Sequence, residues 1–191
     1  MTFSILTRNI FTHEMGLAIA SGSDDCYGGS VLADTRYGII SLQGKGDHPL
    51  KQKIFAELCH GTAPAHILQN ALKHDVMIEQ RQIMILPRDG AAAVYTGTSA
   101  FKWAGHLSDE HTLIAGNMLA TPDVLDAIHK AYYQDRFAHM HRRLLAALKA
   151  GINAGGDMRG HHSAAIQVLS QKPYFWQVKN NPDQLLHHMQ G

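Results

Sequence analysis

The 191-residue chain has few cysteines, no long apolar run and no dense block of one charge. Its two cysteines, Cys26 and Cys59, are too few for a disulfide framework, so a reducing compartment is expected. No run of about 18 apolar residues is present to span a membrane, and the N-terminus lacks the basic and apolar regions of a signal peptide. We therefore expect a cytoplasmic protein that has no membrane partner.

Charge and motif content exclude further classes of function. The formal net charge is +1 and the one dense basic run is 141–143, which argues against a general nucleic-acid binder. The chain has neither a Walker loop nor a Gly-x-Gly-x-x-Gly turn after a strand, so no nucleotide cofactor is indicated. Although there are 14 histidines, no two are spaced as a helical pair of metal ligands. We predict neither a cofactor nor a resident metal.

Hydrophobic periodicity divides the chain into strands, helices, strands, helices and a last strand. The expected strands are 3–8, 15–21, 30–33, 38–43, 82–86, 91–96, 102–107, 112–119 and 163–169. The expected helices are 50–60, one capped by Thr62, one capped by Thr121, 136–150 with Phe137 on its apolar face and Gly151 at its end, and a short one from 181. This order fits two packed antiparallel sheets covered by helices, or a simpler α+β layer fold, in one domain over 1–191.

The first expected strand carries a candidate nucleophile, Thr2, directly after Met1. If Met1 is removed, Thr2 has both halves of a hydrolytic catalyst, because its hydroxyl is a nucleophile and its α-amine can act as the base. An α-amine titrates near ~7.7–8.0, so it can be neutral at cellular pH. The alternative is that Met1 is retained and that Thr2 begins the strand only because threonine favours β structure.

Five motifs occur in an order that is specific to one family. They are Met1-Thr2-Phe3-Ser4-Ile5, Glu79-Gln80-Arg81-Gln82, Trp103-Ala104-Gly105-His106, Gly116-Asn117-Met118-Leu119 and Ala154-Gly155-Gly156-Asp157-Met158-Arg159-Gly160, with Ser163-Ala164-Ala165 after the last. Together they resemble a bacterial family of unknown function in the N-terminal nucleophile (Ntn) hydrolase superfamily. The resemblance spans about residues 1–169 and leaves 170–191 as a C-terminal extension. It implies an α+β fold, a four-layer αββα sandwich of two antiparallel sheets, and no particular substrate.

Two polar residues of these motifs are candidates for the site. Asn117 lies near the end of an expected strand, where its amide could donate to an oxyanion; alternatively it is a buried amide that ties a turn to its neighbour. His106 could orient a loop or a substrate, or could fill a polar niche beside Trp103. Arg81 and Gln82 enter a strand, and we expect a buried structural ion pair between Arg81 and Glu79.

Asp157 and Arg159 lie in a glycine-rich loop between an expected helix and strand. Glycines allow sharp turns and close approach to a ligand, and an arginine can hold a carboxylate through two parallel hydrogen bonds. The alternative is a structural pair inside a tight turn. The loops 22–29 and 44–49, where the chain departs from the family pattern, could also border a pocket.

Two other residues compete with Thr2 for the role of nucleophile. Cys26 is next to Asp24 and Asp25, whose charges should raise its pKa and suppress the thiolate. Ser163 begins a strand but lacks the Gly-x-Ser-x-Gly turn that presents a catalytic serine. Neither is favoured over Thr2.

The sequence therefore predicts an Ntn-type amidohydrolase that cleaves a small amide or peptide bond by acyl transfer through Thr2. Asn117 would stabilise the oxyanion, and Asp157, Arg159 and His106 would bind the substrate, which would carry an anionic group. Self-association into a homo-oligomer is left open. The alternative is a non-catalytic protein of the same fold that binds a small molecule or acts as an assembly partner. A metal-dependent hydrolase would require histidines distant in sequence to converge.

Overall fold

Two antiparallel sheets and five α-helices occur in the computed structural model, which describes residues 2–101, 103–181 and 184. The strands are β1 (Thr2–Arg8), β2 (Met15–Ser21), β3 (Val31–Asp34), β4 (Gly38–Gly44), β5 (Arg81–Pro87), β6 (Ala93–Thr96), β7 (Gly105–Ser108), β8 (Thr112–Asn117), β9 (Ser163–Leu169) and β10 (Tyr174–Val178). The helices are α1 (Cys26–Ser30), α2 (His48–Cys59), α3 (Pro64–His74), α4 (Val124–Gln134) and α5 (Met140–Asn153), with a 3₁₀ turn η1 (Ile78–Gln80).

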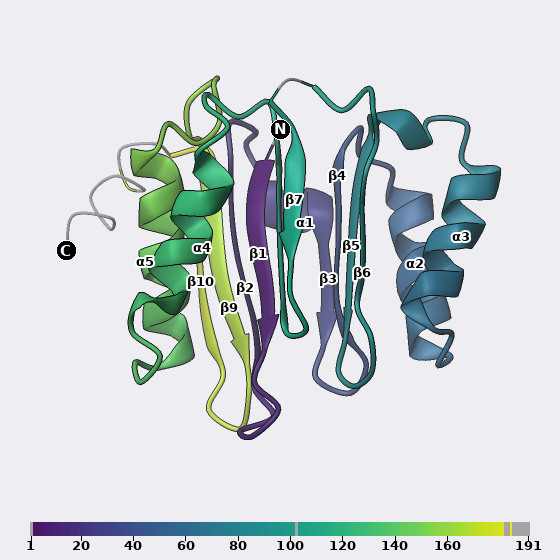
Figure 1. The fold of residues 1–191 in the computed structure, drawn as a ribbon, viewed down its shortest axis with the longest axis horizontal. Coiled ribbons are helices and arrows are strands. Elements are labelled where there is room, and N and C mark those ends of the chain that lie inside the picture. Colours follow the sequence, from purple (N-terminus) through teal and green to yellow (C-terminus); the bar gives the residue numbers. More distant parts are fainter. Residues whose placement is uncertain (1, 102, 182–183, 185–191) are drawn as a thin grey trace.

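The two sheets face each other, with helices on their outer faces (Figure 1). One sheet has six strands in the order β10-β9-β2-β1-β8-β7, and the other has four in the order β3-β4-β5-β6. Helices α4 and α5 cover the outer face of the six-stranded sheet, and α2 and α3 cover that of the four-stranded sheet. Strand β1 lies inside the six-stranded sheet, where it pairs with β2 and β8.

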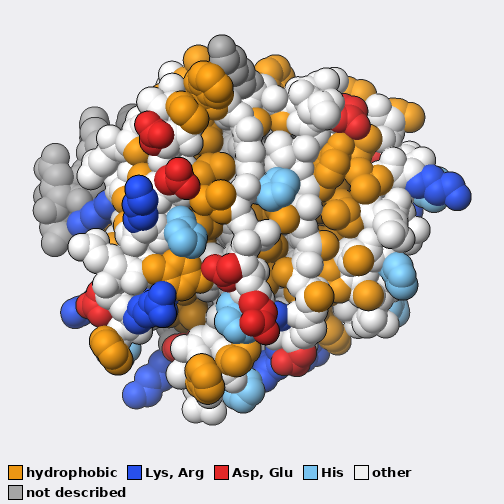
Figure 2. Space-filling view, viewed as in Figure 1, with side chains coloured by type: hydrophobic (Ala, Val, Ile, Leu, Met, Phe, Trp, Pro, Cys, Tyr) orange, Lys and Arg blue, Asp and Glu red, His pale blue; other side chains and the backbone are white. Residues whose placement is uncertain are grey.

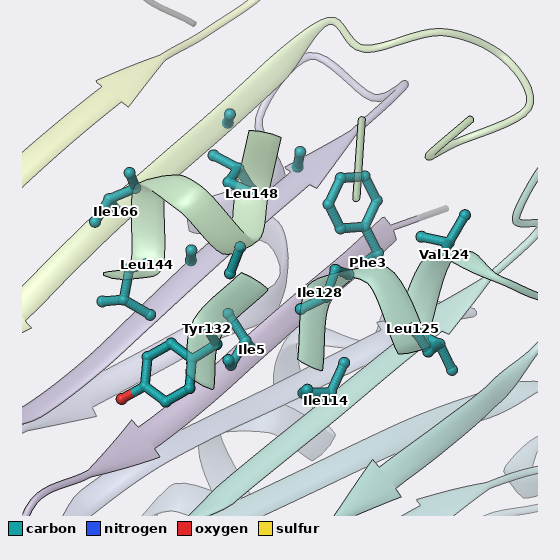
Figure 3. Close-up of a cluster of buried hydrophobic side chains, with 14 of the residues drawn as sticks. Phe3, Ile5, Ile114, Val124, Leu125, Ile128, Tyr132, Leu144, Leu148 and Ile166 are labelled. Atoms are coloured by element: carbon teal, nitrogen blue, oxygen red, sulfur yellow. The ribbon is translucent and has the colours of Figure 1, made fainter. Parts of the chain in front are cut away.

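Side chains of β1 alternate between two apolar cores. Phe3 and Ile5 join the core under α4 and α5, whereas Leu6 joins the core between the sheets. Because successive side chains on a strand point to opposite faces, Thr2 and Ser4 face the space between the sheets. In Figure 3, Phe3 projects from the start of β1 toward α4, which anchors this end of the strand.

The expected strands are confirmed, with shifts of a few residues at their ends. Short apolar segments on either side of turn residues predict the β1–β2 and β3–β4 hairpins and the pairing of β5 with β6. The strand expected over 102–107 begins at Gly105, and Lys102 lies outside the described residues. Strand β10 and the short helix α1 were not expected.

Helix ends differ more from the expectation than strand ends do. Helix α5 begins at Met140 because Asp135 accepts from the backbone N–H groups of Phe137 and Ala138 and forms a turn there; Phe137 is fully exposed. Gly151 does not end α5, which continues to Asn153. The expected caps are also wrong: Ala63 and Asp123 precede α3 and α4, and the Thr121 hydroxyl donates to the Ala154 carbonyl instead.

The short helix expected from 181 falls largely outside the described residues. None of the helices in the described part of the chain has the length and apolar character needed to cross a membrane.

The ion pair expected between Glu79 and Arg81 is wrong. Arg81 is 2% exposed and binds Asp75 at 2.7 Å and Asp47 at 3.2 Å. Glu79 instead accepts from Thr98 and Tyr95. The reason is local, because Glu79 lies in η1 and Arg81 begins β5, so strand geometry does not place them on one face. Glu79 is directed toward β6, and Arg81 toward the starts of α2 and η1.

Candidate functional site

A row of polar residues crosses one end of the six-stranded sheet. Asn117 ends β8, Thr2 begins β1, Ser21 ends β2 and Ser163 begins β9. Thr2 is the cross-strand partner of Asn117, and Ser21 is that of Ser163. All four are buried, with Thr2 the most exposed at 4%. The row contains Thr2 and Asn117, two of the predicted site residues, and we therefore take it as the candidate site.

The Thr2 hydroxyl lies against strand β2. Its Oγ1 donates to Ser21 Oγ at 3.3 Å, and Ser21 Oγ lies 2.7 Å from Ser23 Oγ. Antiparallel partners alternate between hydrogen-bonded and non-bonded pairs, and Arg8 N donates to His111 O on the β8 side. Every second residue of a strand directs its backbone N–H to the same neighbouring strand. Thr2 is six residues before Arg8, so its backbone nitrogen is directed toward Asn117 on β8. The register therefore directs the hydroxyl of Thr2 to one neighbouring strand and its nitrogen to the other.

Gln82 connects the two sheets beside Asn117. Its Nε2 donates to Gly116 O at 2.7 Å, Gly105 O at 2.9 Å and Thr96 Oγ1 at 3.0 Å. Its Oε1 accepts from Asn117 Nδ2 at 2.7 Å. Since carbonyl oxygens can only accept, the atom facing Gly105 and Gly116 must be nitrogen, and this fixes the orientation of both side-chain amides.

A second bridge between the sheets lies next to the first. Gln43 on β4 is the cross-strand partner of Gln82, and its Nε2 donates to Ser4 Oγ at 2.7 Å. Three buried side-chain oxygens of these neighbouring residues have no hydrogen-bond partner: Ser41 Oγ, Gln43 Oε1 and Asn117 Oδ1. We call the residues that meet here the inter-sheet cluster; they are Thr2, Ser4, Ser41, Gln43, Gln82 and Asn117.

His106 reaches this cluster through one intervening hydroxyl. Its Nδ1 lies 2.9 Å from Thr96 Oγ1, which accepts from Gln82. Partial burial lowers the pKa of His106, so the ring is neutral at neutral pH. The Thr96 hydroxyl can then donate to Nδ1, and the chain of contacts runs from His106 through Thr96 and Gln82 to Asn117.

The glycine-rich loop is tied to the residue that follows Ser21. Gly22 N donates to Asp157 Oδ2 at 2.6 Å, and the side chain of Asp157 is fully buried. Burial by itself would raise the pKa of Asp157, but hydrogen bonds from Arg159 and Gly22 outweigh it and lower that pKa. Asp157 is therefore an anion at neutral pH that binds Arg159 at 3.1 Å. The Arg159 side chain is 43% exposed, so its guanidinium is held in place at the surface.

His161 also contacts the glycine-rich loop. Its Nε2 accepts from Asp157 N at 3.2 Å, and its ring lies edge-on to Phe3. Burial lowers the pKa of His161, which keeps the ring neutral and able to accept. A Cβ on Gly156 would lie 2.0 Å from His161 Nε2, so only glycine fits there.

The rival nucleophiles are engaged in structural bonds. Ser163 Oγ donates to Ser23 O at 2.6 Å and accepts from Cys26 N at 3.0 Å. Burial raises the pKa of the Cys26 thiol to about 11, with a smaller contribution from Asp25. The thiolate is thus disfavoured, mainly by burial, whereas the sequence pointed to the neighbouring charges.

Exposed apolar side chains surround the end of the sandwich where β1 starts. Figure 2 shows hydrophobic side chains gathered at this end, which is the upper end in Figure 1. The exposed residues from the adjoining loops are Phe101, Trp103 and Met158. Backbone hydrogen bonds join their loops at Met118 and Leu119. Met118 has a φ of 47°, an unusual value for a residue with a side chain, directly after Asn117.

One cavity lies away from this row of residues, and metal-ligand clusters are not found among the described residues. A cavity of about 540 Å³ opens at the other end of the four-stranded sheet, between the β3–β4 turn, the loop before α3 and the β5–β6 turn. Within residues 2–101, 103–181 and 184, no three His, Cys, Asp or Glu side chains come together as metal ligands would.

Comparison with known proteins supports one part of the resemblance seen in the motifs, membership of a family of unknown function. Over residues 2–185, the chain matches the model of a family of unknown function, DUF1028. It belongs to that family. A crystal structure of protein SPO2555 from Silicibacter pomeroyi, also described as DUF1028, is similar to this chain with a TM-score of 0.87 and 28% identity. The similarity covers 99% of this chain and 86% of that one. Curated proteins gave no match.

The structure of this DUF1028 chain joins the predicted site residues into two groups. Thr2 and Asn117 are adjacent, and His106 reaches Asn117 through Thr96 and Gln82. Asp157 and Arg159 form a pair that Gly22 links to Ser21. Sequence reasoning missed Ser4, Ser41, Gln43 and the bridging role of Gln82. The sequence signal that could have identified these residues is a polar side chain on the inward face of an otherwise apolar strand.

Proposed function

We propose that this protein is an Ntn-type amidohydrolase with a four-layer αββα architecture, and that Thr2 is its nucleophile once Met1 is removed. The observation that carries the proposal is the position of Thr2. It begins a strand inside the six-stranded sheet and faces the second sheet, with its hydroxyl on Ser21 and its nitrogen directed toward Asn117. A surface threonine at a frayed terminus would have none of these contacts.

The reaction is acyl transfer followed by hydrolysis. Thr2 Oγ attacks the carbonyl carbon of an amide, and its proton passes to the Thr2 α-amine. The amine then gives the proton to the departing nitrogen as the C–N bond breaks, which leaves an ester on Thr2. Water, deprotonated by the same amine, hydrolyses the ester and restores the hydroxyl. The proton transfers use groups of one residue, so the surrounding side chains are left to orient Thr2, to stabilise the oxyanion and to bind the substrate.

Asn117 is suited to stabilise the oxyanion of this reaction. Its Nδ2 carries two N–H groups, and the hydrogen bond to Gln82 uses one of them. Because Gln82 is itself held by three acceptors, the second N–H of Asn117 is held in a fixed direction. Fixed donors stabilise a developing negative charge without reorganisation. His106 supports this arrangement through Thr96.

Arg159 is suited to bind an anionic group of the substrate. Asp157 fixes its guanidinium, and Gly22 fixes Asp157 beside the strand that carries Ser21. A carboxylate on the substrate could then be held at the rim, near Phe101 and Trp103.

A second candidate function is a non-catalytic protein of the same fold that binds a small molecule or an assembly partner. The observation that favours it is the burial of Thr2, which is 4% exposed. The two candidates make opposite predictions for covalent chemistry, since a non-catalytic protein would form no adduct with electrophilic amide or lactone probes.

Processing and a Thr2 substitution test the proposal together. Intact mass and N-terminal sequencing of protein from its native host should show that the chain starts at Thr2. Thr2→Ala should abolish amide hydrolysis and probe labelling while the melting temperature stays nearly unchanged; Thr2→Ser, which keeps a hydroxyl and an amine, should retain part of the activity. Quantitative retention of Met1 in the native protein would rule out the mechanism.

A further inference from the structure

The inter-sheet cluster contains hydrogen-bonding capacity that the protein itself does not use. Ser41, Gln43 and Asn117 are at most 2% exposed, yet each has a side-chain oxygen without a partner. A buried polar atom left without a partner costs about 1–3 kcal/mol, so native proteins rarely keep one without a use. Three such atoms meet at the end of the sandwich that contains Thr2.

Strand geometry places the three residues on the inner faces of the two facing sheets. Ser41 and Gln43 are two residues apart on β4 and share its inner face. Gln43 is the cross-strand partner of Gln82, which binds Asn117, and Gln43 also binds Ser4, two residues after Thr2. The oxygens therefore come from both sheets, and Asn117 is the cross-strand partner of the proposed nucleophile Thr2.

The chemistry of the free atoms defines what they can bind. Asn117 Oδ1 is a fixed acceptor, because Gln82 determines which atom of that amide is oxygen. Ser41 can both donate and accept. Gln43 offers an acceptor, and because its partner Ser4 is a hydroxyl, its amide can also turn to offer a donor. One fixed acceptor beside two adaptable groups matches a ligand with N–H donors and a carbonyl oxygen.

We propose that the inter-sheet cluster is a binding site for a primary carboxamide. The ligand N–H groups bind Asn117 Oδ1 and Gln43 Oε1, and its carbonyl oxygen binds the second Asn117 N–H. Asn117 then pairs with the ligand amide through two hydrogen bonds, and the carbonyl carbon faces Thr2. Ser41 Oγ donates to the other lone pair of the ligand carbonyl oxygen.

The absence of charge in the cluster selects a neutral ligand. All six side chains of the inter-sheet cluster are uncharged, and burying an ammonium ion among them without a carboxylate would be costly. A carboxamide offers the same N–H donors without that cost. The group that enters the cluster is therefore a neutral amide and not an amine, whatever charge the rest of the ligand carries outside the cluster.

This inference rests on the proposed function where it names the reaction. If Thr2 attacks a primary carboxamide, the C–N bond breaks, the nitrogen leaves as ammonia with the proton taken from Thr2 Oγ, and water releases the carboxylic acid. The products are one carboxylic acid and one ammonia per amide. Binding of the carboxamide itself requires no reaction.

Acetamide and N,N-dimethylacetamide provide a matched pair of probes, because only acetamide has N–H groups. The protein to use is the full chain starting at Thr2, with Thr2→Ala to prevent turnover. Side-chain amide NMR signals of Asn117, Gln43 and Gln82 should shift saturably with acetamide and not with N,N-dimethylacetamide. Ser41→Ala should weaken acetamide binding by about 3- to 10-fold, as expected for one lost hydrogen bond. Ser108→Ala, on the exposed side of β7, is the control.

The outcomes separate this inference from the proposed function. Equal shifts with both probes, no shift with either, or equal binding of ammonium chloride would overturn the carboxamide site. If the processed protein cleaves secondary amides but acetamide leaves these signals unchanged, the site is wrong and the Thr2 mechanism stands. If acetamide binds at these residues but no ammonia is released with Thr2 present, the site stands and the mechanism is wrong.

Discussion

Gln82 determines what the residues around it can do. Three acceptors around its two N–H groups fix its amide, and that amide in turn fixes Asn117. Aliphatic side chains at both positions together would fill a similar space without burying two side-chain amides. The cluster therefore costs stability that packing alone would not require, as buried polar groups at functional sites commonly do.

Arg159 can be tested by a substitution that keeps its charge. Arg159→Lys loses the planar fork that binds Asp157 and a carboxylate together, so we expect binding of anionic substrates to weaken by roughly tenfold. Arg159→Ala should weaken it further. Because the side chain is 43% exposed, the melting temperature should change little in both variants. KM for a carboxylate-bearing amide, compared with its neutral analogue, is the measurement; equal effects on both substrates would contradict an anion-binding role.

Helix α5 approaches the six-stranded sheet closely at Gly151. A Cβ there would lie 2.7 Å from Phe3 Cε2 and 2.9 Å from Ile128 Cγ1. Although alanine favours a helix by about 1 kcal/mol over glycine, the overlap should dominate in a packed core. We expect Gly151→Ala to lower the free energy of unfolding by about 1–3 kcal/mol, measured by urea denaturation.

Gly29 in α1 provides the matched control for that substitution. Nothing lies within 4 Å of a Cβ built on Gly29, so Gly29→Ala should be neutral or slightly stabilising. If Gly151→Ala were equally harmless, the close approach of α5 to Phe3 would not be what requires glycine.

Strands could be predicted from this sequence because short apolar runs, such as 83–86 in β5, are bounded by turn residues. Helix ends could not, because they depend on contacts made by residues outside the pattern. The turn at Asp135 displaces the start of α5, and the approach of Phe3 explains Gly151 better than a helix stop does. Strand β10 is an edge strand paired only with β9, so its half-buried side chains give a weak signal.

The candidate site was predictable in part for a related reason. Thr2, Asn117 and Asp157 stand in motifs that mark the family, and the sheet register brings the first two together. Ser41 and Gln43 belong to no such motif. Their role depends on how the two sheets face each other. That is a property of the tertiary fold, and hydrophobic periodicity does not predict it.

At the scale of the whole molecule, side-chain bridges join the two sheets at both ends. At the Thr2 end, Gln82 binds Asn117 and Gln43 binds Ser4. At the opposite end, Arg8 of β1 donates to Pro87 O at 2.9 Å and to Gly90 O at 2.7 Å in the β5–β6 turn. The space between is filled by an apolar core, so the polar groups determine how the sheets align while the core supplies most of the stability.

Acid should lower the free energy of unfolding in two stages. Two histidines and two aspartates have pKa values that are lower in the folded protein than in the unfolded chain. Burial lowers the pKa of His161 and of His106, so the unfolded chain takes up protons first as pH falls below about 6.5. The Arg81 and Arg159 guanidinium groups help to lower the pKa of Asp75 and Asp157, so a second uptake on unfolding begins below about 4. In both windows the unfolded state binds more protons than the folded state.

The melting temperature should therefore be nearly constant from about pH 8 to 7, fall as pH drops below about 6.5, and fall again below about 4. His161→Gln can still accept from Asp157 N but does not titrate, so it should make the first decline shallower. His74→Gln, at an exposed position of α3, is the control and should leave the profile unchanged. Calorimetry at constant ionic strength measures all three profiles. A melting temperature that rises on acidification, or a first decline that His161→Gln leaves as steep as before, would show that these buried groups do not control the acid stability.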